Sequence, residues 1–212
     1  MQNDKLHAYI EGLIPNRQDL FNEMEMLAKE NHIPIMELAG IEAMLQILRI
    51  QKPKQILEVG TAIGYSALRM ADALSECKIV TIERDEERLG LAEKYIQRAG
   101  KERQIHIIRG DALEVESEVK DHAPYDAIFI DAAKGQYKRF FELYAQYLSE
   151  DGIIVTDNVL FKGLVCEKEI ENKRIRNLVK KIDEFNHWLS NHPDYQTIIL
   201  PVGDGVAISK KR

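Results

Sequence analysis

Residues 55–74 read QILEVGTAIGYSALRMADAL, and this stretch decides how the rest of the chain is interpreted. Gln55–Val59 is an apolar run with the length of a buried strand, whereas Gly64–Leu74 has helical spacing. Gly60 and Gly64 lie in the turn between them, where glycine lets the backbone approach a ligand and the helix start offers free N–H groups. The three-glycine dinucleotide pattern is absent, which disfavours a pyrophosphate. The turn therefore either receives a ligand with a carboxylate end or only connects strand to helix.

The same alternation of strand and helix continues along the chain. Four more apolar runs predict strands at Lys78–Glu83, Gln104–Arg109, Tyr125–Asp131 and Gly152–Asp157. Helical spacing separates them at Asp85–Ala99, more weakly after Asp111, and at Tyr137–Leu148. An alternation of this kind predicts a doubly wound α/β fold, in which a parallel sheet has helices on both faces.

The two ends of the chain complete the predicted fold. Helices are expected at Arg17–Glu30, Ile35–Ile50 and Ile170–Leu189, and strands at Thr197–Pro201 and Val206–Lys210, which flank a Gly203-Asp204-Gly205 turn. The last two strands form a hairpin. We therefore expect a seven-stranded, mostly parallel sheet with an antiparallel C-terminal hairpin strand. A length of 212 residues fits one domain, 1–212, with a helical cap over 1–50 and a core over 51–212.

Charge, cysteine content and hydropathy limit the kinds of protein to which this sequence can belong. The 29 Lys and Arg residues against 35 Asp and Glu residues give a net charge of -6, which argues against a surface coated for nucleic acid but allows a local basic patch. Cys77 and Cys166 form no CxxC pair and are interpreted as free thiols in a reducing compartment. No run of 18 uncharged apolar residues occurs, so we expect a cytoplasmic protein without a membrane span.

The first three strand ends suggest a nucleoside site. Glu83 ends the second strand 23 residues after Gly60, near the spacing at which an acid meets a ribose diol. Asp111 and Ala112 follow the third strand and could lie beside an adenine amine. Glu83 could instead be only solvated, and Asp111 could cap the next helix. Together the three ends favour a ligand that carries adenosine without a phosphate.

The fourth and fifth strand ends carry a different chemistry. Asp131 follows one strand, and Asp157 and Asn158 follow the other, so a parallel sheet brings two carboxylates and an amide together. These are hard oxygen donors of the kind that Mg²⁺ prefers, and a cation would relieve the repulsion between the two acids. Lys134 lies close enough to act as a general base. The alternatives are helix caps after each strand and a surface lysine.

Five segments resemble, in order and spacing, the cation-dependent O-methyltransferases that use S-adenosylmethionine, the group of catechol and caffeoyl-CoA O-methyltransferases. They are LEVGTAIGYSALRMA, TIERD, GDA, IFIDAAKGQY and TDNVLFKG. The resemblance runs from about Ile33 to the C-terminus and implies a Rossmann-like class I methyltransferase fold. IPIMELAG, DAAKGQY, DNVLFKGLV, NHWLSNHPDY and PVGDGVAISKK look most like the bacterial branch that methylates 5-hydroxyuridine at the tRNA wobble position.

The resemblance implies a role for each matching residue. The methionine and ribose parts of the cofactor would be held by Glu58, Gly60, Ser66 and Glu83, with Asp111 and Ala112 beside the adenine and Met36 covering it. Asp131, Asp157 and Asn158 match the ligands of Mg²⁺ or another divalent cation. Asp131 would also contact the cofactor and take part in catalysis, and Lys134 matches the lysine beside the nucleophilic oxygen.

The acceptor has two candidates. One is 5-hydroxyuridine in the anticodon region of tRNA, which would become 5-methoxyuridine, and the other is a small catechol-like molecule with two neighbouring oxygens. Catechol enzymes carry an aromatic residue just before the lysine, where this chain has Ala132-Ala133, which leaves a more open mouth suited to a nucleobase.

Cations that could meet tRNA phosphates follow the metal motif, at Lys162, Arg174, Arg176, Lys180 and Lys181. A solvated amphipathic helix is the alternative interpretation of that segment. The family also implies a homodimer. A nucleotide-sensing module or a dehydrogenase-like dinucleotide binder is disfavoured by the missing third glycine and by the paired acids.

Overall fold

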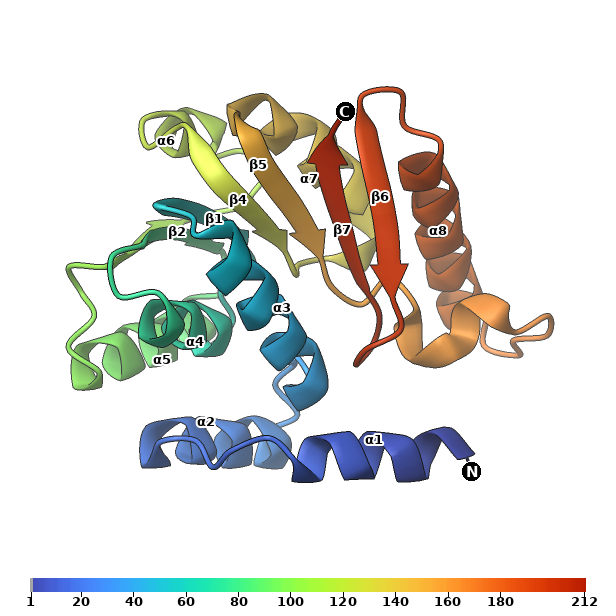
Figure 1. Cartoon of the computed structure of the whole chain (residues 1–212), viewed down its shortest axis with the longest axis horizontal. Helices are drawn as coiled ribbons and strands as arrows, with labels where there is room; N and C mark the ends of the chain where they lie inside the picture. The colour runs from blue at the N-terminus through green and yellow to red at the C-terminus, as the bar shows by residue number, and fades with distance from the viewer. Residues whose placement is uncertain (1) are drawn as a thin grey trace.

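A seven-stranded sheet runs through the computed structural model, which describes residues 2–212 (Figure 1). Its strands are β1 (Gln55–Val59), β2 (Lys78–Glu83), β3 (Ile105–Arg109), β4 (Tyr125–Ile130), β5 (Leu148–Thr156), β6 (Tyr195–Leu200) and β7 (Val206–Lys211). Their order across the sheet is β3-β2-β1-β4-β5-β7-β6, and β7 runs antiparallel to both of its neighbours. The predicted seven-stranded, mostly parallel sheet with an antiparallel hairpin strand is confirmed.

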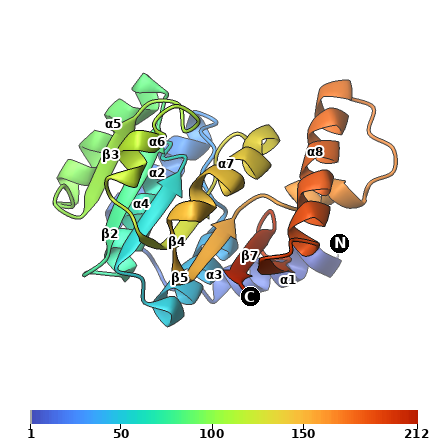
Figure 2. The same ribbon diagram turned by 90° about the horizontal axis from the view of Figure 1, so that it is seen from above.

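Helices cover both faces of the sheet (Figure 2). They are α1 (Gln2–Gly12), α2 (Asp19–Glu30), α3 (Leu38–Gln51), α4 (Tyr65–Ala73), α5 (Glu86–Arg98), α6 (Glu116–Lys120), α7 (Tyr137–Tyr144) and α8 (Lys173–Ser190), with short 3₁₀ segments η1 (Lys134–Gln136), η2 (Ala145–Tyr147) and η3 (Phe161–Cys166). One core contains residues of α2–α5, and the other contains residues of α6–α8. In the part of the chain that the structure describes, no helix is both long and apolar enough to cross a membrane.

The central strands are apolar because each contributes to both cores. In β1, Ile56 belongs to one core and Leu57 to the other, and neither side chain is exposed. Parallel strands with both faces covered therefore appear in the sequence as continuous apolar runs rather than as an alternation. This is why the predicted bounds of β1 and β2 agree with the structure.

Several boundaries differ from the predictions by one to four residues, and α3, for example, begins at Leu38 instead of Ile35. The helix predicted over Tyr137–Leu148 ends at Tyr144, and β5 begins at Leu148 instead of Gly152, because the buried Leu148 packs as the first strand residue. Helix α8 begins at Lys173 instead of Ile170, since the side chain of Asn172 accepts hydrogen bonds from the backbone N–H groups of residues 174 and 175. Helix α1 was not predicted.

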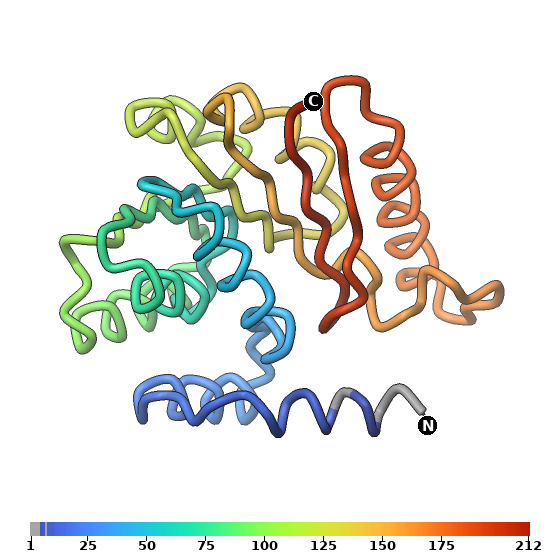
Figure 3. Tube along the Cα trace, in the orientation of Figure 1, coloured from blue at the N-terminus to red at the C-terminus, as the bar shows by residue number. Residues whose placement is uncertain are grey.

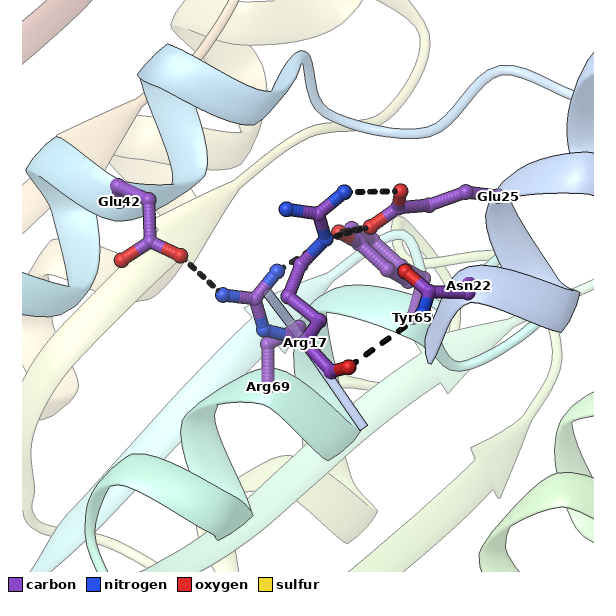
Figure 4. A network of polar contacts seen from close by, with 6 residues as sticks. All are labelled: Arg17, Asn22, Glu25, Glu42, Tyr65 and Arg69. Atoms are coloured by element: carbon purple, nitrogen blue, oxygen red, sulfur yellow. Dashed lines mark hydrogen bonds and ion pairs between the residues drawn. The ribbon is translucent and has the colours of Figure 1, made fainter. Parts of the chain in front are cut away.

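A polar network joins the N-terminal helices to the start of α4 (Figure 4). Arg69 donates to the Tyr65 hydroxyl at 2.8 Å, and that hydroxyl donates to Glu25 at 2.6 Å. Arg17 donates two hydrogen bonds to the same Glu25 carboxylate, at 2.7 and 2.9 Å. Arg69 also forms an ion pair with Glu42 on α3. Arg69 is 6% exposed, so these contacts are largely shielded from water. The helices α2 and α3, whose path can be followed in Figure 3, are thereby tied to the first two turns of α4.

Candidate active site

A pocket of about 380 Å³ opens at the carboxyl ends of the parallel strands, where open α/β sheets place their ligands. Its lining comes from four strand ends, from the segment before α3, and from residues of α4, α5, η1 and α7. Among the residues singled out in the sequence, those that line it are Met36, Gly60, Ser66, Glu83, Asp111, Ala112, Asp131 and Lys134. The topology therefore brings both predicted groups, the nucleoside residues and the residues around Asp131, to one cavity.

The turn after β1 lies so close to β4 that its first residue must be glycine. Gly60 has a φ of +106°, and a Cβ there would lie 2.2 Å from the carbonyl oxygen of Asp131. Gly64, with a φ of +83°, ends the turn, and α4 begins at Tyr65. The first N–H groups of α4 have no partner within the helix and are available to an anionic group.

Glu83 forms a fixed carboxylate on the pocket wall. Its oxygens accept hydrogen bonds from the backbone N–H groups of Ala62 at 2.8 Å and of Arg84 and Asp85, both at 2.9 Å. The residue is only 9% exposed, and it lines the pocket. A carboxylate held in this way is oriented before any ligand arrives, as recognition of a diol requires.

Replacing Glu83 with alanine should weaken S-adenosylmethionine binding by about 10-fold to 150-fold, because the loss of hydrogen bonds to a charged group costs about 1.5–3 kcal/mol. Isothermal titration of the purified variant measures this effect. Glu87→Ala, at an exposed position on α5, is the matched control and should bind as the wild type does. A Glu83→Ala variant with wild-type affinity would refute the ribose-binding role.

Glu58 lies behind the pocket wall. Its side chain is fully buried and accepts hydrogen bonds from the hydroxyls of Ser66 and Thr81. Burial raises the pKa of Glu58 to about 8, against the opposing effect of the two hydroxyl donors. Because Ser66 lines the pocket and Glu58 does not, Glu58 supports a lining residue, and its predicted direct contact with a cofactor stays a prediction.

Asp111 already has protein partners. It accepts from the backbone N–H of Leu113 at 2.9 Å and from Arg84 at 2.8 Å, and the backbone bond is the main reason that its pKa is lowered. Asp111 thus closes a turn before α6, and the alternative that it caps this helix is wrong, because the N-cap residue is Val115 and no side chain caps the helix. The carbonyl of Ala112 accepts from the Tyr144 hydroxyl at 2.5 Å, which fixes the loop along the pocket.

Asp131 lines the other side of the pocket, and Asp157 and Asn158 converge on it without lining the pocket themselves. The Asn158 amide nitrogen lies 3.0 Å from an oxygen of Asp131 and 2.7 Å from an oxygen of Asp157. Burial raises the pKa of both acids, and the charge of Asp131 raises that of Asp157 further. Within residues 2–212 no group of three or more His, Cys, Asp and Glu side chains is placed to hold a metal. The cluster is two carboxylates and one amide, as the strand ends predicted.

Two aromatic residues border this cluster. The Lys134 ammonium lies 5.9 Å from the centre of the Phe161 ring. The Tyr137 hydroxyl is buried without a hydrogen-bond partner in the described structure. Burial and then the charges of Asp131 and Asp157 raise the pKa of Tyr137, so it stays a neutral phenol beside the two acids.

Comparison with known proteins identifies the family of this chain. An O-methyltransferase family model matches residues 15–212. The chain belongs to this O-methyltransferase family. Caffeoyl-CoA O-methyltransferase 2 of Populus trichocarpa is 29% identical over 222 residues, with 100% of this chain and 90% of that protein covered. The Populus kitakamiensis caffeoyl-CoA O-methyltransferase is 34% identical over 172 residues, and the match covers 78% of this chain and 73% of that protein.

Two solved structures share the whole fold of this O-methyltransferase. A Staphylococcus aureus protein provisionally described as a caffeoyl-CoA O-methyltransferase is 36% identical with a TM-score of 0.88, and the match covers 100% of this chain and 98% of that one. The SAH-bound methyltransferase PaMTH1 of Podospora anserina is 26% identical with a TM-score of 0.86, covering 100% and 95%. The predicted class, S-adenosylmethionine-dependent O-methyl transfer of the caffeoyl-CoA type, is confirmed at this level.

The predicted tRNA-binding residues of this O-methyltransferase are all exposed, but they differ in their surroundings. Lys181 lies next to a segment that lines the pocket, because its ammonium is 3.5 Å from the place of a Cβ on Gly135, between the lining residues Lys134 and Gln136. Lys180 pairs with Glu184 at 3.6 Å, and Arg176 donates to the carbonyl of residue 170 at 3.0 Å. Lys162 follows Phe161 in η3, and Arg174 lies in the first turn of α8.

Several residues at this site were not predicted from the sequence. Gln136 and Phe140 line the pocket from η1 and α7, and Phe161 faces Lys134. Phe161 stands within the quoted segment TDNVLFKG, three residues after Asn158, so its place next to the acid cluster was a usable signal. Gln136 and Phe140 follow Lys134 closely, but no charge or spacing distinguishes them from core residues.

Proposed function

We propose that this O-methyltransferase transfers the methyl group of S-adenosylmethionine to 5-hydroxyuridine at the wobble position of tRNA, with the help of Mg²⁺ or another divalent cation. The convergence of Asp131, Asp157 and Asn158 beside Lys134, at one side of the pocket that Gly60 and Glu83 form, carries this proposal. A small catechol-like acceptor is the second candidate, since the same convergence suits any pair of neighbouring oxygens.

The donor set fits a hard cation. The buried Asp157 and the half-buried Asp131 repel each other, and a divalent ion bound by both would remove this cost. Rotation of the Asn158 side-chain amide by half a turn would replace its nitrogen with its carbonyl oxygen, which gives three oxygen ligands with no sulfur or imidazole. Oxygen-only donor sets of this kind favour Mg²⁺, Ca²⁺ or Mn²⁺.

The residues of the chain then divide the reaction between them. When bound, the cation would hold two neighbouring acceptor oxygens and lower the pKa of the hydroxyl. Lys134, as the neutral amine, accepts the hydroxyl proton. The acceptor oxygen attacks the methyl group of the sulfonium, whose S–CH3 bond breaks as S-adenosylhomocysteine leaves. The Gly60 turn and Glu83 hold the cofactor in line with that attack, so most of the rate enhancement comes from placement. In 5-hydroxyuridine the 5-hydroxyl and O4 form the required pair, as the two hydroxyls of a catechol do.

Two features favour tRNA over a catechol. Ala132 and Ala133, which line the pocket before Lys134, leave open a mouth that an aromatic residue would narrow. Lys181 brings a positive charge next to the lining residues Lys134 and Gln136, and further basic residues continue from it along α8. A nucleobase that enters the pocket carries phosphates on both sides, and such cations would meet them.

Neutralising Arg174, Arg176, Lys180 and Lys181 together should weaken tRNA binding and flatten its salt dependence. Each phosphate contact contributes about -0.7 to -0.9 to the log-log slope of affinity against salt, so four lost contacts reduce the slope by about 3. Turnover on hydroxyuridine-containing tRNA and on a catechol, measured side by side, tests the assignment. Catechol turnover should barely change. Equal tRNA activity with the wild-type salt slope would move the proposal to the small-molecule acceptor.

We also propose that the enzyme forms a homodimer through its N-terminal helices. An apolar face lies on and just after α1, where Leu6, Tyr9 and Leu13 are 55%, 64% and 65% exposed. In a monomer this face would remain in contact with water. The double variant Tyr9→Glu/Leu13→Lys should dissociate the dimer in light-scattering measurements, whereas Ile198→Lys on β6 serves as the control. A monomeric wild-type protein would contradict this proposal.

A further inference from the structure

The turn between β6 and β7 holds the loop that follows β5. The backbone N–H groups of Val159 and Leu160 donate to the carbonyls of Gly205 at 3.1 Å and of Asp204 at 2.8 Å. The third contact uses a side chain, since the N–H of Lys162 donates to the Asp204 carboxylate at 3.0 Å. Residues 159–162, here named the acceptor loop, are therefore fastened to this turn at three points.

The turn between β6 and β7 packs tightly against the acceptor loop. A Cβ on Gly205 would lie 2.4 Å from the Leu160 side chain and 2.8 Å from its backbone nitrogen. Gly205 has a φ of +88°, which glycine adopts without strain. The turn thus reaches the loop backbone directly, and Asp204 is held at the distance at which its carboxylate meets Lys162.

The shape of the acceptor loop needs such an anchor. Phe161 and Lys162 have φ values of +45° and +56°, in the left-handed region that residues with a Cβ rarely adopt. A conformation of this kind persists where surrounding contacts hold it, and such residues often lie at functional sites. In the acceptor loop, this conformation sets the position of the Phe161 ring, whose centre lies 5.9 Å from the Lys134 ammonium.

We propose that Asp204 is a positioning residue for the methyl acceptor, because its carboxylate holds Phe161 and Lys162 in the shape that forms the acceptor side of the pocket. The inference rests on the proposed function to the extent that Lys134 marks the acceptor side. Asp204 does not line the pocket itself, so it acts through the loop and touches neither cofactor nor reacting atoms.

Asp204 also carries a negative charge near Asp131 and Asp157, and this charge raises the pKa of both. Two substitutions separate the hydrogen bond from the charge. Asp204→Asn keeps an oxygen that accepts from the Lys162 N–H but removes the charge, whereas Asp204→Ala removes both. If the hydrogen bond matters, only the alanine variant is impaired. If the charge matters, both variants are impaired alike.

The test combines amide hydrogen exchange of residues 158–163 with kinetics and S-adenosylhomocysteine affinity. In Asp204→Ala we expect exchange in that segment to become about 10-fold faster, as for a locally opened loop. The acceptor KM should rise about 10-fold through misplacement, with cofactor affinity unchanged. Asp204→Asn should stay close to the wild type in all three measurements. Asp194→Ala, exposed at the opposite end of the hairpin, is the control.

Unchanged exchange and acceptor KM in Asp204→Ala would overturn the inference, as would an Asp204→Asn variant that fails in the same way as the alanine variant. Thermal unfolding of both variants identifies a general loss of stability, which would move cofactor affinity as well as acceptor KM. Failure of the proposed function gives a different result. In that case the wild type itself leaves hydroxyuridine-containing tRNA unmethylated. Amide hydrogen exchange and catechol turnover then still test the positioning role of Asp204.

Discussion

The Asp157→Ala variant should lose methyl transfer by at least about 100-fold while its S-adenosylhomocysteine affinity stays close to that of the wild type. Substitution of residues that only orient a metal ligand costs about 10–100-fold, so loss of a ligand itself should cost at least the upper value. Asp157 is 2% exposed and contacts Asn158, whereas the Glu83 side of the pocket lies on the other side of β1. Steady-state turnover and isothermal titration on the same preparation measure both quantities.

Chelation is the companion experiment, because it leaves every side chain in place. Excess chelator should abolish turnover of the wild type, and added Mg²⁺ should restore it. Asp183→Ala on α8, away from the acid cluster, is the control for loss of a carboxylate. Undiminished turnover in excess chelator would remove the cation from the mechanism.

A second large effect is expected for Gly60→Ala. The added Cβ would come within 2.2 Å of a backbone carbonyl, and a φ of +106° is unfavourable for alanine, so the turn has to move away from β4. We expect cofactor affinity to fall by at least about 100-fold, which corresponds to about 2.7 kcal/mol. The free energy of unfolding should fall by about 1–3 kcal/mol. Titration with S-adenosylhomocysteine and denaturant unfolding check the two effects.

Gly90→Ala is the matched control for this substitution. Gly90 lies inside α5, and a Cβ there would meet nothing within 4 Å. Alanine should stabilise the helix by about 0.5–1 kcal/mol and leave cofactor binding unchanged. A Gly60→Ala variant that binds the cofactor as Gly90→Ala does would show that close approach of this turn to β4 is not needed.

The sheet and the strand-end residues could be predicted because one physical rule governs both. Strands buried on two faces leave continuous apolar runs in the sequence, and parallel strands bring their carboxyl ends to one edge. Glu83 and Asp131 therefore line one pocket, and Asp157 lies behind Asp131, although the three acids are far apart in the chain. Their burial, and the backbone N–H groups that hold Glu83, are consistent with those assignments.

Other parts of the site depend on contacts that leave no local pattern. Asp204 was seen only as a turn residue, since its contact with Lys162 joins positions 42 residues apart. The family resemblance predicts that Glu58 contacts the cofactor, but its hydrogen bond with Ser66 depends on how β1 faces α4, which leaves no local pattern in the sequence. Helix α1 packs little of its apolar surface, and with Leu6 and Tyr9 exposed its sequence lacks the periodicity of a buried face.

The most direct test of the account is nucleoside analysis of tRNA. Purified enzyme, S-adenosylmethionine and Mg²⁺ are incubated with tRNA that carries 5-hydroxyuridine, and the digested nucleosides are separated and identified by mass. The account predicts that 5-hydroxyuridine disappears as 5-methoxyuridine forms, and that neither change occurs with the Asp157→Ala variant. Intact 5-hydroxyuridine in a reaction whose enzyme methylates a catechol under the same conditions would contradict the proposed tRNA substrate.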